Sequence, residues 1–140
     1  MAAPSITLHR VNLIRAATPA VALVVWTLFV WVGRIRNIAA DDTLRGSALA
    51  WRLITAGAFT TAGLALALAL VWYVNTRHPF ALPVVTWLAG PLAMVGMVFW
   101  AIRGTTIALG DYGAGFKVVH SVLALVTIGL GLWVLRWLRR

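Results

Sequence analysis

The sequence predicts an all-α integral membrane protein with four transmembrane helices. Of its 140 residues, 62% are hydrophobic and only 11% are charged, which is more apolar surface than a soluble domain of this size can bury. The apolar residues gather in four runs without a single charge, each with about the twenty residues that cross a 30 Å hydrocarbon layer. Because peptide groups in lipid must be hydrogen-bonded within their own segment, we expect each run to be a helix.

The predicted spans cover residues 16–33, 53–74, 82–102 and 118–135. Together they form one transmembrane domain over residues 16–140. Residues 1–15 lack a clean helical period and are expected to form an N-terminal surface segment. Thr18 followed by Pro19 is typical of a helix start, with Thr18 as the N-cap. A cleaved secretory signal is the alternative for the first run, but Arg34 and Arg36 directly after it argue against cleavage.

The charge balance favours lipid as the partner of the basic residues. Twelve Lys and Arg stand against three acidic residues, and the basic residues lie mostly where apolar runs end. This placement suits anionic head groups, whereas a nucleic-acid binder gathers its basic residues on a water-exposed face. We therefore expect an inner or plasma membrane protein that binds no nucleic acid. Positive charge is balanced between the two sides, so the sequence leaves the orientation open.

The eight Trp residues predict two interfacial belts, because indole rings concentrate at the boundary between lipid and water. One belt borders the first and third loops and comprises Trp31, Trp51 and Trp100. The other borders the opposite surface and comprises Trp72, Trp87, Trp133 and Trp137. Only Trp26 is expected in the middle of a span.

A motif of the form W-x-x-R-x-x-x-I-x-x-x-D occurs twice, at one constant offset. Its two copies consist of Trp31, Arg34, Ile38 and Asp42, and of Trp100, Arg103, Ile107 and Asp111. Each copy leaves an odd-numbered span, so the repeat predicts two tandem parallel helical hairpins, arranged as a pseudo-two-fold four-helix bundle. If the odd helices continue about two turns past the lipid, each motif shares one helix face.

The repeated motif also predicts a binding site. A ring of Arg34, Arg52, Arg103 and Lys117 around the pseudo-axis would bind anionic lipid head groups or an acidic partner. Each Asp is expected to cap the next helix or to meet a basic residue of the other hairpin. The alternative is that these residues bind no specific ligand. The Arg side chains would then only extend to the membrane surface, and the repeat would only reflect the duplication of a hairpin.

Within the spans, small residues at a spacing of four predict close helix packing, as in Gly57 to Thr61 and Gly63 to Ala67. Gly90 and Pro91 predict a kink in the third span. If the kink has a function, it is expected to act as a hinge. His120 is either a packing histidine or a pH-sensitive group.

No catalytic or metal site emerges from the sequence, and no cofactor is expected. The spans contain no carboxylate, the chain contains no Cys, and its Asp residues have no His or Glu beside them to complete a site. We therefore predict a non-enzymatic accessory or scaffold subunit, as a homo-oligomer or within a larger membrane complex. The main alternative is a small homo-oligomeric channel or transporter with a kinked helix. A weaker one is lipid-linked chemistry at Asp42 and Asp111.

Overall fold

The computed structural model describes residues 16–76 and 78–140, so the predicted N-terminal surface segment lies outside the described residues. The described part is all-helical. Its four helices are α2 (Thr18–Ala39), α3 (Gly46–Thr76), α4 (Ala81–Leu109) and α5 (Ala114–Leu138). Each is long and apolar enough to cross a membrane, so the prediction of four helices of this length and composition is confirmed.

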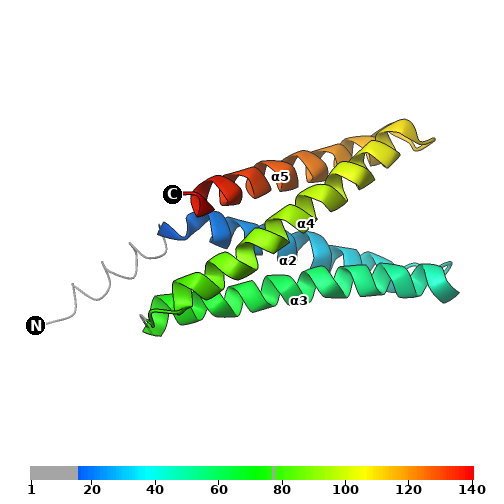
Figure 1. Ribbon diagram of the computed structural model, residues 1–140. Helices are drawn as coiled ribbons and strands as arrows, with labels where there is room; N and C mark the ends of the chain where they lie inside the picture. Colours follow the sequence, from blue (N-terminus) through cyan, green and yellow to red (C-terminus); the bar gives the residue numbers. More distant parts are fainter. Residues whose placement is uncertain (1–15, 77) are drawn as a thin grey trace, which may run out of the picture.

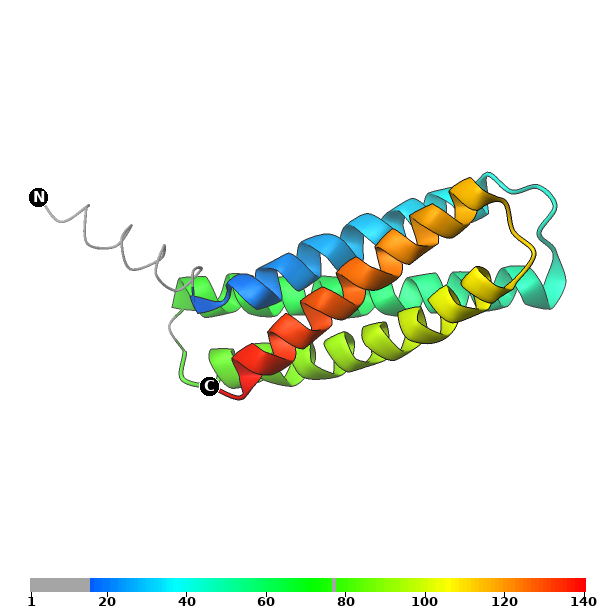
Figure 2. The same cartoon turned by 90° about the horizontal axis from the view of Figure 1, so that it is seen from above.

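The helices form an elongated bundle in which each helix packs on the next and α5 returns to α2 (Figures 1 and 2). The helices α2 and α4 also touch, whereas α3 and α5 lie apart. Figure 1 shows the α2/α3 pair and the α4/α5 pair diverging toward the end that carries the loops at 40–45 and 110–113. We call this end the splayed end.

The odd helices do continue past the apolar runs, but not far enough to carry the whole motif. The helix α2 ends at Ala39 and α4 at Leu109, where the chain turns extended at Gly110 (φ −79°, ψ 169°). Asp42 and Asp111 therefore lie in loops, and the expectation that each motif shares one helix face is wrong for its Asp.

The start of the first helix also differs from the prediction. Its N-cap is Ala17, without a side-chain cap hydrogen bond, and Pro19 lies in the first turn. The chain therefore enters α2 one residue earlier than the Thr18 cap would place it. The fixed φ of proline still suits this first turn.

Burial repeats between α2 and α4 at the offset of the sequence motif. Four identical pairs of residues are buried in both helices: Ala20 and Ala89, Leu23 and Leu92, Trp31 and Trp100, and Ile38 and Ile107. This agreement fits two related helices in similar surroundings. The tandem-hairpin arrangement itself remains a prediction.

Two of the Trp residues predicted at the interface lie in the core. Trp31 and Trp100 are each 5% exposed, and the ring of Trp31 stacks on that of Phe59 at 4.3 Å between centroids. In contrast, Trp51 and Trp87 are 69% and 74% exposed, as an interfacial belt requires. Hydropathy cannot distinguish a buried Trp from an exposed one near the end of a span, because the side of the helix on which the residue lies decides whether its ring faces inward.

The middle of the bundle is closely packed between α4 and α5, whereas an open apolar groove of about 320 Å³ lies between α3 and α4, beside Phe59 and Leu92. A Cβ atom added to Gly131 of α5 would lie 2.6 Å from Sδ of Met97 on α4, so these helices approach as closely as glycine permits. Trp26 of α2 donates a hydrogen bond from Nε1 to the Thr127 hydroxyl of α5, at 2.8 Å. The helix α4 runs without interruption through the exposed Pro91, so the predicted hinge at Gly90 and Pro91 remains a prediction.

Candidate functional site

Each helix places one basic or titratable side chain at a similar distance from the splayed end. Arg34 lies five residues before the end of α2, and Arg103 lies six before the end of α4. Arg52 and His120 lie six residues after the starts of α3 and α5. At 1.5 Å per residue, all four are about 8–9 Å inside their helix ends. The bundle therefore carries a polar layer close to one membrane surface.

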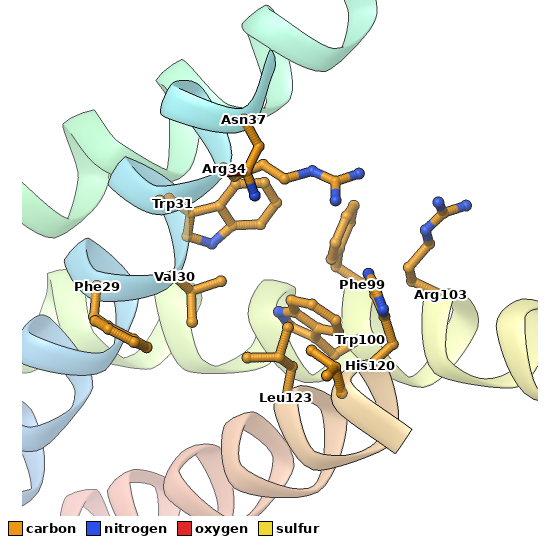
Figure 3. A pocket seen from close by; sticks show the side chains of 12 residues that line it. Phe29, Val30, Trp31, Arg34, Asn37, Phe99, Trp100, Arg103, His120 and Leu123 are labelled. Atoms are coloured by element: carbon orange, nitrogen blue, oxygen red, sulfur yellow. The ribbon is translucent and has the colours of Figure 1, made fainter. Parts of the chain in front are cut away.

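A cavity of about 260 Å³ opens in this layer between α2, α4 and α5 (Figure 3). We call it the α5-side cavity. Arg34 extends toward the side where Arg103 lies, the ring of Phe99 lies next to the end of the Arg34 side chain, and His120 lies beside Trp100. Apolar and aromatic side chains form most of its remaining wall, including Phe29, Val30, Trp31, Val119 and Leu123.

A second cavity, of about 170 Å³, lies between α2, α3 and α4, and we call it the α3-side cavity. It shares a wall with the first, formed by Trp31, Arg34, Phe99 and Arg103. Its own outer wall comes from α3 and consists of Trp51, Arg52 and Thr55. The motif residues Trp31, Arg34 and Arg103 therefore stand at the border of both cavities.

The electrostatics of the two cavities are one-sided. Arg103 and Arg52 are close enough to Arg34 for their charges to repel it, and among the residues that the structure describes no acidic one lines either cavity. Asp41 forms the one ion pair within residues 16–76 and 78–140, with Arg52 at 4.0 Å. Arg34 and Arg103 therefore have no carboxylate partner in the described part of the chain.

Asp41 is fixed by its own loop. The hydroxyl and the backbone N–H of Thr43 both donate hydrogen bonds to its Oδ1 atom. These bonds, the hydroxyl first, hold the pKa of Asp41 below its usual value, and the nearby Arg52 and Arg45 act in the same direction. The sequence motif singled out Asp42, but its neighbour Asp41 makes the contact with Arg52, from within the same helix pair.

The two motif Asp residues neither cap the next helix nor contact a basic residue of the other hairpin within the described residues. Asp42 and Asp111 are exposed, and neither has a hydrogen bond or ion pair to another residue that the structure describes. They also lie in different loops, so they do not form a shared acid pair. Across residues 16–76 and 78–140, no three His, Cys, Asp or Glu side chains cluster as metal ligands.

Lys117 does not join the predicted ring. Its Nζ atom donates a hydrogen bond to the carbonyl of Ala108 at 3.1 Å, near the end of α4, and it lines neither cavity. A cation in this position complements the carbonyl end of a helix. Lys117 lies only three residues into α5, one turn closer to the loop than His120.

His120 takes the place on α5 that we predicted for Lys117. It is buried, its ring lies 3.9 Å from that of Phe116 between centroids, and its Nδ1 atom is 2.9 Å from the Phe116 carbonyl oxygen. Because a carbonyl oxygen can only accept, Nδ1 carries the proton, which leaves Nε2 as an acceptor in the neutral ring. Counting residues from the helix ends would have selected His120 in place of Lys117.

Comparison with known proteins gives no further guide, because no family model, curated protein or solved structure matches the chain. The chemistry of the site must therefore be argued from its own residues. Two guanidinium groups without a carboxylate partner among the described residues, aromatic walls and two adjacent cavities suit a negatively charged, partly apolar ligand.

Proposed function

We propose that this protein is a non-enzymatic membrane subunit, an accessory or scaffold protein, that binds the acidic head group of a membrane lipid at its splayed end. The observation that carries the proposal is the convergence of Arg34, Arg52 and Arg103, from three helices, on cavities whose described walls contain no acidic residue. Bringing like charges together costs free energy unless an anion compensates them. A bound phosphate would do so, since guanidinium groups match it in a bidentate fashion.

The same proposal includes a tandem-hairpin origin of the bundle. It is supported by the motif copies, by the matching burial of α2 and α4, and by the contact between these two helices. In such an arrangement Arg34 and Arg103 are equivalent residues that face each other across a pseudo-two-fold axis. The inner or plasma membrane is the proposed location, since it contains anionic lipid.

A role as a scaffold is supported by small residues that the bundle leaves uncovered. A Cβ atom added to Gly57 of α3 would meet no other atom within 4 Å, and Thr61 one turn later is exposed. By contrast, Gly63 already packs against Thr27 and Leu28 of α2. The pair Gly57 and Thr61 is therefore open to a partner helix or a second copy of the chain.

The rival function, a small channel or transporter, receives less support from the geometry. The cavity in the middle of the bundle measures about 10 Å³, which is at most the space of one water molecule. This small volume does not support a path for ions through one copy. A path between copies stays open as the alternative.

Native mass spectrometry after mild detergent extraction tests the proposal. We expect retained anionic lipid or a retained partner, and we expect phosphatidylglycerol to stay bound at a higher collision energy than phosphatidylcholine. The variant Arg34→Gln/Arg103→Gln should lose this preference. The control Arg36→Gln/Arg45→Gln removes as much charge from the same end without touching either cavity, and it should keep the preference. A bare monomer, or equal loss in both variants, would contradict the proposal.

A further inference from the structure

We infer that the two cavities together hold one phosphatidylglycerol-type lipid, with its phosphate between Arg34 and Arg103. One acyl chain then lies in the α5-side cavity, and the glycerol of the head group lies in the α3-side cavity. This inference rests on the proposed function and deepens it, because it names the lipid class and its pose.

The phosphate position follows from the shared wall. Among the described residues, Arg34 and Arg103 are the charged ones that line both cavities, so they mark the place where a ligand that occupies both would pass from one to the other. Figure 3 shows Arg34 extending toward the side of Arg103, with the ring of Phe99 next to the end of its side chain. A phosphodiester between the two guanidinium groups would accept hydrogen bonds from both and screen their repulsion.

The chain position follows from the outer wall of the α5-side cavity. Phe29 and Val119 belong to this wall and are 69% and 56% exposed, so in a membrane their outer faces contact lipid tails. Leu123, further along α5, continues the apolar wall toward the membrane interior. An acyl chain can therefore enter sideways from the bilayer, between α2 and α5, without crossing a polar region.

The head-group position follows from the different wall of the α3-side cavity, which offers Arg52 and Thr55. The Thr55 hydroxyl donates its hydrogen to the Trp51 carbonyl at 2.9 Å, so its oxygen is left to accept from a ligand hydroxyl. A glycerol head group supplies such donors. A choline head group supplies none and would bring a fourth positive charge beside three Arg.

Photocrosslinking in lipid nanodiscs tests this pose. Phosphatidylglycerol and phosphatidylcholine would each carry a diazirine in one acyl chain, and mass spectrometry of the digested protein would locate the adducts. We expect phosphatidylglycerol to label the segments around Phe29 and residues 119–123 in clear excess over phosphatidylcholine. Arg34→Gln/Arg103→Gln should remove this excess, because each Arg lost lowers the affinity for the anionic lipid by about fivefold. Arg36→Gln/Arg45→Gln should keep it.

A second variant keeps the test decisive if the Arg variant does not fold. Leu123→Trp fills the α5-side cavity and leaves every Arg in place, so it should abolish the excess labelling around Phe29. Equal labelling in Leu123→Trp and the unchanged protein would overturn the pose. Phosphatidylglycerol that is retained in native mass spectra but labels all helices evenly would overturn the pose alone. Absence of any preference for anionic lipid would overturn the pose and the proposed function together.

Discussion

The middle of the bundle and its splayed end are built from the same four helices, but the helices are in close contact in the middle and separated by cavities at the splayed end. In the middle, Gly131 and Met97 hold α4 and α5 in close contact and the cavity inside the bundle measures about 10 Å³, although an open groove lies outside it between α3 and α4. At the splayed end, cavities of about 260 and 170 Å³ separate the helix pairs, and like charges face each other. The contrast indicates that the middle supplies the stability, which leaves the end free to bind a ligand at some cost in packing.

The largest expected effect is on the stability of the middle. Gly131→Leu should destabilise the protein by about 3 kcal/mol, because its side chain would overlap Met97 and force α4 and α5 apart. Gly129→Leu is the matched control, since a Cβ atom there meets nothing within 4 Å. Denaturant titration in detergent, followed by Trp fluorescence, measures both. Equal losses in the two variants would show that the close approach of these helices is not what stabilises the bundle.

The second effect should appear only at the splayed end. Arg34→Gln/Arg103→Gln should weaken binding of phosphatidylglycerol by about 25-fold while the unfolding midpoint in lipid-free neutral detergent stays equal or rises. The midpoint should not fall because the substitution removes a repulsion between the two charges. Titration of the lipid into purified protein, with the unfolding midpoint recorded for the same samples, separates the two quantities. A lower midpoint with unchanged lipid binding would reverse the assignment of roles to the two regions.

A smaller effect concerns the polar contact that crosses the middle. The hydrogen bond from Trp26 to Thr127 should contribute about 0.6 kcal/mol, as interhelical bonds in membranes do on average. A double-mutant cycle of Trp26→Phe and Thr127→Val measures the coupling energy of this bond, because the cycle subtracts the effect of the smaller Phe ring. Its value should be the same with and without phosphatidylglycerol. A coupling that changes with the lipid would mean that the middle and the splayed end are not independent.

The sequence predicts the fold well at the level of elements, because lipid imposes one requirement that hydropathy measures directly. Four charge-free runs gave four helices, and the helix ends differ from the runs mainly by the turns that extend past the lipid. Hydropathy does not report which face of a helix turns inward. For this reason Trp31 and Trp100 were placed at the interface, although both are buried.

The site could be predicted in part. The repeated motif identified Arg34 and Arg103, and the predicted ring of basic residues added Arg52, all of which line the cavities. Lys117 was selected for its charge, although His120 is the residue at the matching depth. The prediction was least accurate for the loops. The two motif Asp residues were expected on helices, but they lie in loops beyond the helix ends. Loop geometry depends on local bonds such as those of Thr43 to Asp41, which no periodicity reveals.

The smallest expected effect is the pH dependence at Asp41, in the first loop of the splayed end. Its pKa is lowered in the folded protein, so its stabilising contribution is complete above the unfolded value of about 3.9 and is lost as the pH falls through the folded pKa. Below about pH 4, the difference in stability between the unchanged protein and Asp41→Asn should therefore shrink.

The control for this last effect is Asp42→Asn, which removes the adjacent carboxylate but no bond to Thr43 or Arg52. An NMR titration of the Thr43 amide should give a midpoint below the usual Asp value in the unchanged protein and in Asp42→Asn, and no such transition in Asp41→Asn. Because the Asp41 side chain is 38% exposed, solvent screens its charge, and the change in unfolding midpoint should stay near the limit of measurement. A large loss in Asp41→Asn would instead mean that the loop, and not the packed middle, holds the first two helices together.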